Sequence, residues 1–113
     1  MKNSAITFFA IFTLLLLACS NTEGMKTEKF TVYGNCGMCK KTIETSLEGA
    51  NGVSSAEWNM KNDNMTVTFD PKIISLEKIH KKIAAVGYDT DLERAPDAAY
   101  KKLHSCCQYE RKS

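Results

Sequence analysis

The sequence predicts an α+β fold, with four antiparallel strands in one sheet and two helices on one face of that sheet. Two patterns predict it: alternating apolar residues, which are typical of half-buried strands, and apolar residues every three or four positions, which are typical of amphipathic helices. Along the 113 residues the order is strand, helix, strand, strand, helix, strand. This is the split βαβ, or ferredoxin-like, arrangement. A chain of this length has room for one such domain, which we place at residues 26–94.

Each predicted element has its own signal in the sequence. Strands are expected at 26–33, 53–60 and 65–69, with a short fourth strand from residue 88, and helices are expected at 38–47 and 76–86. Ser75 has the side chain of an N-cap for the second helix, and Gly87 follows its last apolar residue as a C-terminal stop. Trp58 and Met60 are expected on the buried face of the second strand. His80 is expected on the surface of the second helix.

Residues 1–18 have the features of a secretory signal peptide. Lys2 precedes an apolar run of about 14 residues, roughly 21 Å as a helix, which is short of the roughly 30 Å hydrocarbon core of a bilayer. An uncleaved N-terminal anchor is the alternative. The letters LLAC that end the run resemble the bacterial lipobox, which implies lipidation of Cys19 and a polar tether over 19–25. We therefore expect a lipid-anchored lipoprotein at the cell envelope that faces the periplasm or the exterior, where disulfides can persist.

Charge and motif content exclude several functional classes. The 15 Lys and Arg residues nearly balance the 13 Asp and Glu residues, so a nucleic-acid partner is not expected. The sequence has no recognisable nucleophile triad, acid–base pair or phosphate-binding loop, and no enzymatic turnover is predicted. The five Cys residues are the distinctive feature. With Cys19 assigned to the lipid anchor, the others form two pairs, Cys36 with Cys39 and Cys106 with Cys107.

The first pair lies where a loop becomes the first turn of a helix. Free N–H groups and the helix dipole favour the thiolate form of Cys36 and Cys39 at this end. Two thiolates can hold Cu(I) or Hg(II), whereas Zn(II) usually takes four ligands. A thioredoxin-like redox pair and a structural disulfide are the competing interpretations. The redox fold needs a cis proline facing the disulfide, and neither Pro71 nor Pro96 occupies such a place.

Residues 27–91 resemble the heavy-metal-associated domains of copper chaperones, metal-pumping ATPases and the periplasmic mercuric-ion binding protein. The resemblance is carried by the CxxC motif after the first strand, by the letters FDP at 69–71 and by VGY at 86–88. It implies that Cys36 and Cys39 are the metal ligands.

The resemblance also concerns the residues around this loop. It implies that the ring of Tyr88 lies near the metal loop. Gly34 and Asn35 stand where the family usually has Met and Thr, and Met38 lies instead between the two cysteines. Met38 either fills the space of the family's Met from another direction or stays exposed.

The tail, residues 95–113, lies outside the resemblance. Pro96 and the acidic residue after it predict the start of a short helix. The sequence leaves three arrangements open for its Cys106–Cys107 pair. These are a strained vicinal disulfide, a second metal site with His104 as a further ligand, or a tail that folds back and adds its thiolates to the CxxC loop.

Together these patterns predict a metal-binding lipoprotein that transfers or sequesters a soft ion at the cell envelope. Cu(I) is favoured, with Hg(II), Zn(II) and Cd(II) as the other candidates. The expected partners are the membrane, through the lipid anchor, and a metal-transporting ATPase or efflux system. The alternatives are a mercuric or broad-specificity detoxification binder and a thiol–disulfide exchange protein.

Overall fold

The computed structural model describes residues 24–112. The predicted signal peptide, the lipidation site Cys19 and most of the tether lie outside the described residues. Within the described range, no helix combines the length and the hydropathy that a membrane span requires.

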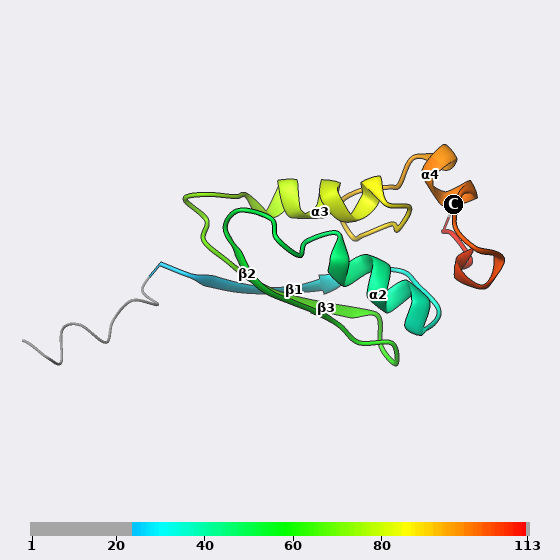
Figure 1. Cartoon of the computed structure of the whole chain (residues 1–113), viewed down its shortest axis with the longest axis horizontal. Coiled ribbons are helices and arrows are strands. Elements are labelled where there is room, and N and C mark those ends of the chain that lie inside the picture. Colours follow the sequence, from blue (N-terminus) through cyan, green and yellow to red (C-terminus); the bar gives the residue numbers. More distant parts are fainter. Residues whose placement is uncertain (1–23, 113) are drawn as a thin grey trace, which may run out of the picture.

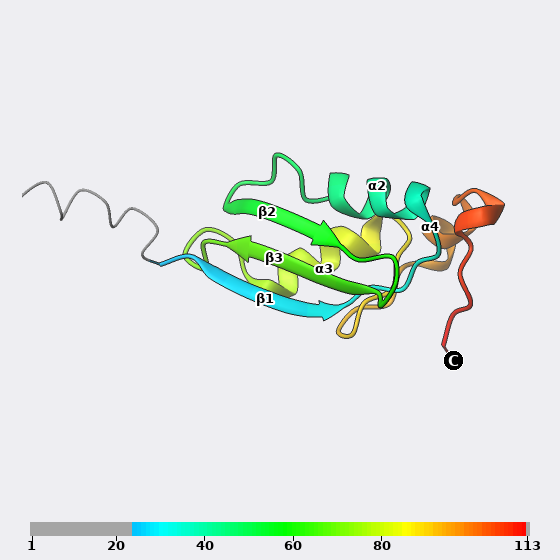
Figure 2. The ribbon, with the colours of Figure 1, turned by 90° about the horizontal axis from the view of Figure 1, so that it is seen from below.

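The described chain folds into the predicted α+β arrangement. In chain order its elements are β1 (Lys26–Thr31), α2 (Gly37–Thr45), β2 (Val53–Trp58), β3 (Asn64–Phe69), α3 (Leu76–Ala85), α4 (Asp97–Lys101) and the 3-10 turn η1 (Ser105–Cys107). The strands form one antiparallel sheet in the order β1-β3-β2. Figures 1 and 2 show α2 and α3 on the same face of this sheet. The ferredoxin-like fold class is confirmed.

The predicted fourth strand does not form within residues 24–112. In its place, Thr90 makes a single antiparallel bridge with Val32. The reason lies in the Thr90 hydroxyl, which accepts hydrogen bonds from the N–H groups of Leu92 and Glu93 at 3.2 and 3.0 Å. A side chain that satisfies nearby backbone donors in this way turns the chain and competes with a strand. The sheet of the described domain therefore has three strands and one bridge.

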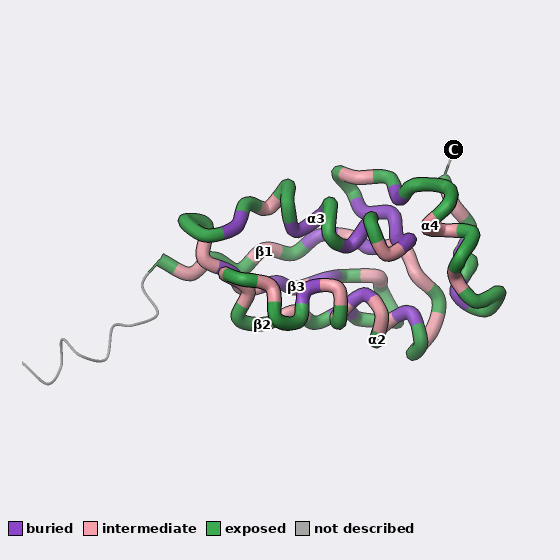
Figure 3. The backbone as a smooth tube through the Cα atoms, turned by 45° about the horizontal axis from the view of Figure 1, so that its top comes forward, coloured by how far each residue is buried: buried purple, intermediate pink, exposed green. Residues whose placement is uncertain are grey.

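The apolar periodicity correctly predicts the core between the sheet and the helices. Its fully buried members include Val32, Ile43, Leu47, Trp58, Met65, Val67, Ile79 and Ile83. In Figure 3 the buried parts of α3 turn toward the sheet. The Ser75 side chain caps α3 by accepting a hydrogen bond from Lys78 N at 3.1 Å, and Gly87 has a φ of +109° just past the helix. The predicted N-cap and the predicted C-terminal stop of α3 are both confirmed.

Two burial predictions are wrong. Met60 is exposed because β2 ends at Trp58, so Met60 falls in the turn that follows. His80 is buried instead of lying on the surface. Its ring packs against the ring of Phe30 at 4.0 Å, and its Nδ1 hydrogen-bonds to the hydroxyl of Thr90. A polar side chain on an apolar helix face has here been taken into the core, where the Thr90 hydroxyl is the partner of Nδ1 and the buried Nε2 has no partner among the described residues.

Candidate metal centre

The CxxC pair lies at the N-terminal end of α2. Cys36 occupies the N-cap position and is half-buried, whereas Cys39 lies in the first turn and is fully buried. Their Sγ atoms are 3.7 Å apart. The N–H of Asn35 donates to the Cys39 Sγ at 3.5 Å. The two thiols are therefore held side by side, with Cys36 as the member that solvent or a partner can reach.

The backbone at the start of α2 favours the charged form of Cys36. The N–H groups of Cys39 and Met38, which have no partner further back in the helix, lower the pKa of the Cys36 thiol to about 7. The neighbouring Cys39 thiol acts in the same direction, and burial opposes it only weakly. Near neutral pH a large fraction of Cys36 is consequently thiolate, the form that binds metals.

The loop rests on the indole of Trp58. A Cβ at Gly34 would lie 3.0 Å from two ring carbons of Trp58, so any larger residue would have to displace the ring, whereas glycine fits without this. The indole Nε1–H donates to the carbonyl oxygen of Val32 at 2.9 Å, which fixes the ring. This packing explains why Gly34 replaces the larger residue of the family pattern. Met38 does not take over that space, since its side chain is exposed.

The C-terminal tail returns to this loop and brings its two thiols with it. The Cys107 Sγ lies 3.9 Å from the Cys36 Sγ, and the Cys106 Sγ lies 3.9 Å from the Cys107 Sγ. All four cysteines of the described chain are free thiols. Of the three arrangements left open by the sequence, the structure has the folded-back tail. His104 is exposed and lies outside this sulfur cluster.

The tail is held by polar contacts that the sequence did not predict. The Tyr109 hydroxyl accepts from the N–H of Asp89 at 2.7 Å and donates to the carbonyl of Gly87 at 2.9 Å. Arg111 contacts both carboxylate oxygens of Asp89, at 2.8 and 3.0 Å, and also donates to the carbonyl of Ala95 at 2.6 Å. Tyr109 and Arg111, called here the tail clamp, have no local sequence signal because their partners lie about 20 residues upstream.

Asp89 is ionised within this clamp. Burial raises the pKa of its carboxyl, but the hydrogen bonds from Arg111 and the Ala95 N–H outweigh that effect, so the pKa lies below its ordinary value. The contact between Arg111 and Asp89 is thus a charge-assisted pair with two hydrogen bonds, the strongest class of side-chain pairing.

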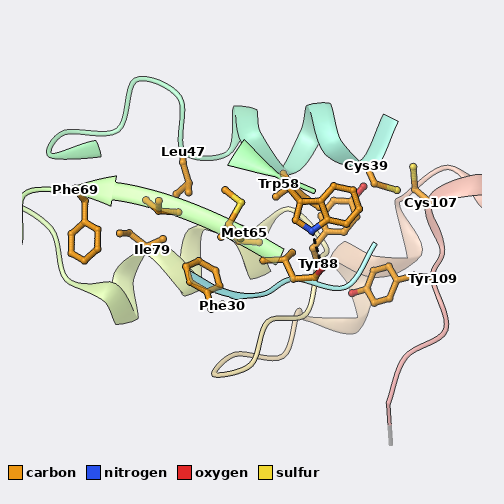
Figure 4. Close-up of a cluster of buried hydrophobic side chains, with 14 of the residues drawn as sticks. Phe30, Cys39, Leu47, Trp58, Met65, Phe69, Ile79, Tyr88, Cys107 and Tyr109 are labelled. Atoms are coloured by element: carbon orange, nitrogen blue, oxygen red, sulfur yellow. Dashed lines mark hydrogen bonds between the residues drawn. The ribbon is translucent and has the colours of Figure 1, made fainter. Parts of the chain in front are cut away.

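Figure 4 shows Tyr88 beside Trp58, at the end of the core where Cys39 and Cys107 lie. Its ring is fully buried, and its hydroxyl has no hydrogen-bond partner among the nitrogen and oxygen atoms of the described chain. Burial, followed by the adjacent sulfurs of Cys39 and Cys107, raises the pKa of Tyr88 above its usual range, so the hydroxyl keeps its proton. Burial also raises the pKa of Cys107, to about 12. The family resemblance implies that Tyr88 lies near the loop, and the structure places it there.

The donor set at this end of the molecule is sulfur only. The group of potential ligand atoms within 4.8 Å of one another in the described chain consists of Cys36, Cys106 and Cys107, and Cys39 adjoins it through Cys36. Thiolates suit soft ions such as Cu(I) and Zn(II) better than hard, oxygen-seeking ones. The residues present therefore fit a thiophilic metal as cargo.

Known proteins share the fold and part of the sequence of this domain. The model of the heavy-metal-associated domain matches residues 34–89. A zinc-transporting ATPase from Synechocystis is 43% identical over 70 residues, which is 61% of this chain but only 10% of the ATPase. Copper chaperone CopZ from Staphylococcus aureus is 33% identical over 69 residues, which is 61% of this chain and 88% of the chaperone. The crystal structure of oxidized MerP from Ralstonia metallidurans superposes with a TM-score of 0.56 at 28% identity, over 59% of this chain and 94% of that one.

A ferredoxin-like sandwich with a CxxC loop at the start of its first helix defines a class of small, thiol-bearing domains. Within that class, the chain belongs to the heavy-metal-associated domain family. The family model ends at residue 89, so the two cysteines of the tail lie outside the region that it matches.

Proposed function

We propose that the protein binds a soft metal ion, Cu(I) foremost, through Cys36 and Cys39 and passes it to a partner. The observation that carries the proposal is the pair of thiols 3.7 Å apart at the N-terminus of α2, one of which has a pKa of about 7. Such a pair presents thiolate at neutral pH without a separate base. The relatives named above, a copper chaperone and a zinc-transporting ATPase, support metal handling as the task.

Transfer would proceed by exchange of thiolate ligands. Cys39 is buried and receives the Asn35 N–H, whereas Cys36 is half-exposed. An incoming partner thiolate therefore approaches the ion on the Cys36 side and binds before Cys36 leaves. No bond of the protein chain is made or broken, and each released thiolate takes up a proton from solvent. The proposed activity is binding and delivery, without catalytic turnover.

A domain of the same family within a metal-transporting ATPase is the partner that this chemistry favours. Such a domain offers its own thiolate pair, which would bind the ion with a similar free energy. The ion would therefore move between the two sites with only a small free-energy difference. The local similarity of this chain to a zinc-transporting ATPase supports that choice. Hg(II), Zn(II) and Cd(II) are the competing cargoes.

The arrangement of the domain suits attachment at its N-terminus. In Figure 1, β1 begins at the end of the domain opposite to the CxxC loop. A lipid on Cys19, joined by the short tether, would leave the metal loop facing away from the bilayer of the cell envelope. Metabolic labelling with a radioactive fatty acid tests this: label should enter the wild-type chain and be absent from Cys19→Ala, and an unlabelled wild-type chain would rule out the anchor.

Competition with a coloured Cu(I) chelator tests the binding proposal. The reduced full chain should remove Cu(I) from the chelator, and the double variant Cys36→Ser, Cys39→Ser should lose this ability. Met38→Leu is the matched control, because it changes the exposed residue between the cysteines and keeps both thiols. A wild-type chain that cannot compete, but exchanges disulfides with a reduction potential near the −270 mV typical of thioredoxin, would make it a redox protein instead.

A further inference from the structure

We infer that Cys106 and Cys107 belong to the same metal centre as Cys36 and Cys39, so that the tail closes one shared four-thiolate site over the CxxC loop. The inference deepens the proposed function and rests on it, since it takes the loop cysteines as ligands. It extends the site to a segment that lies outside the matched family region.

The spacing of the sulfur atoms is the first argument. From Cys39 through Cys36 and Cys107 to Cys106, successive Sγ atoms are 3.7, 3.9 and 3.9 Å apart. Four thiolates around one ion at about 2.3 Å stand about 3.8 Å from each other when the geometry is tetrahedral. Three of the six sulfur pairs therefore have the spacing of a tetrahedral site. Cys39 lies outside the group whose Sγ atoms are all within 4.8 Å of one another, so a small closure of the tail toward Cys39 would complete the site around one ion.

Tyr88 supplies an independent argument. Its buried hydroxyl lacks a nitrogen or oxygen partner and lies beside the sulfurs of Cys39 and Cys107, one from each pair. A buried hydroxyl without an acceptor costs free energy, whereas a metal-bound thiolate accepts a hydrogen bond readily. The hydroxyl would thus gain its acceptor when both pairs act as ligands together.

Contacts on two sides hold the tail in place, as a metal site requires. The tail clamp fixes it on the Asp89 side, and on the other side the Asn35 side-chain amide donates to the carbonyl of Cys106 at 3.3 Å. Asn35 is one of the two departures from the family's loop pattern, and its contact is with the tail. Cys107 itself is buried against the core cluster.

A shared site changes which ions the protein can hold and how it releases them. Two thiolates suffice for Cu(I), but divalent ions such as Zn(II) and Cd(II) are held firmly only when a third and fourth ligand are present. The tail would therefore extend binding to divalent soft ions. It would also cover the loop, so delivery to a partner would require the tail to move aside.

Cd(II) titration of the reduced full chain measures the number of thiolate ligands directly, because thiolate-to-cadmium charge-transfer absorption grows with each bound sulfur. The wild type should bind one ion per chain. The variant Cys106→Ser, Cys107→Ser should also bind one, with about half the absorption and at least a tenfold larger Kd. His104→Ala, which alters an exposed residue outside the cluster, is the control and should match the wild type.

Replacing the buried Cys107 could weaken metal binding by disturbing the packing. The single variant Cys106→Ser avoids this problem, because Cys106 is exposed. It should lose about a quarter of the absorption and keep one ion per chain. Two ions bound by the wild type and one by the double tail variant would mean separate sites. Unchanged absorption and Kd in both tail variants would mean that the tail takes no part. Either result overturns the shared site.

The variant Cys36→Ser, Cys39→Ser distinguishes a failure of the shared site from a failure of the proposed function. If it loses Cd(II) while the tail variants bind like the wild type, the proposed function stands and the shared site fails. If it binds Cd(II) with the wild-type Kd, the loop is not the metal site, and the proposed function fails as well.

Discussion

The two cysteine pairs meet at one end of the molecule, but different interactions hold them there. Cys39 belongs to the hydrophobic core, and its loop rests on the buried Trp58. Cys107 of the tail pair also reaches the core cluster, but the tail around it is tied down by hydrogen bonds and by the ion pair of Arg111 with Asp89. The loop half of the proposed site thus depends on apolar packing, whereas the tail half depends on apolar packing together with a polar clamp.

This difference predicts separate stabilities for the two halves. Apolar packing depends little on pH, and losing it unfolds the whole domain. A polar clamp on a terminal segment can open locally while the domain stays folded. The loop pair should therefore persist as long as the fold does, and the tail pair should be displaceable.

Removing the support of the loop should have the largest effect. Trp58→Ala deletes a fully buried indole and should lower the free energy of unfolding by about 3–5 kcal/mol, measured by urea denaturation. The buried member of each pair, Cys39 and Cys107, should then lose protection from alkylation together. Met60→Ala, at an exposed position two residues later, should change stability by less than about 0.5 kcal/mol. If Trp58→Ala unfolded at the same urea concentration as the wild type, the core would not be what holds the loop.

Opening the clamp should affect the tail alone. Arg111→Ala leaves Asp89 ionised without its partner in a mostly buried position, a loss of about 3 kcal/mol in the docking of the tail. Alkylation of Cys107, followed by mass spectrometry, should become much faster while Cys39 stays protected.

Lys102→Ala, which removes an exposed cation from the same tail, is the control for this change. It should leave both alkylation rates as they are. Equal acceleration at Cys39 and Cys107 in Arg111→Ala would contradict a separable tail.

Acid should weaken the same clamp more gently. The pKa of Asp89 is lower in the folded chain than its unfolded value of about 3.9, so its contribution to stability is full above that value and is lost as the pH falls through the folded pKa. Below roughly pH 4 the docked tail should loosen. The fall in urea midpoint between pH 6 and pH 3 should be smaller in Asp89→Asn than in the wild type, and equal falls would exclude Asp89 as the responsible group.

The same contrast explains what could be predicted from the sequence. Core positions such as Val67 and Ile83 repeat at the period of their strand or helix, and the CxxC spacing marks Cys36 and Cys39, so local patterns suffice for them. The link between Arg111 and Asp89 joins residues 22 positions apart through a pairing that no local pattern encodes.

Two of the three wrong predictions, those for His80 and the fourth strand, share one physical cause. His80 and the segment after Tyr88 were misjudged because one hydroxyl, that of Thr90, satisfies a buried ring nitrogen and also turns the chain. Periodicity reports which face of an element is apolar, but it does not report which polar group will find a partner inside the fold.

The smallest expected effect distinguishes a structural tyrosine from one that serves the metal. In the metal-free chain, Tyr88→Phe removes a hydroxyl that lacks a nitrogen or oxygen partner, so stability should stay unchanged or rise by up to about 1 kcal/mol. In the Cd(II)-loaded chain the same change removes a donor to thiolate ligands, so the Kd should increase a few-fold.

Tyr109→Phe is the matched control, because the Tyr109 hydroxyl has two backbone partners, the Asp89 N–H and the Gly87 carbonyl. That variant should lose about 1–3 kcal/mol already in the absence of metal, since it leaves buried backbone groups unpaired. Opposite signs for Tyr88→Phe in urea denaturation and in Cd(II) binding would tie its hydroxyl to the bound state. If Tyr88→Phe instead lost stability without metal and kept the wild-type Kd for Cd(II), Tyr88 would have a structural role only. The contact between Cys36 and Cys107 would then be the remaining link between the two thiol pairs.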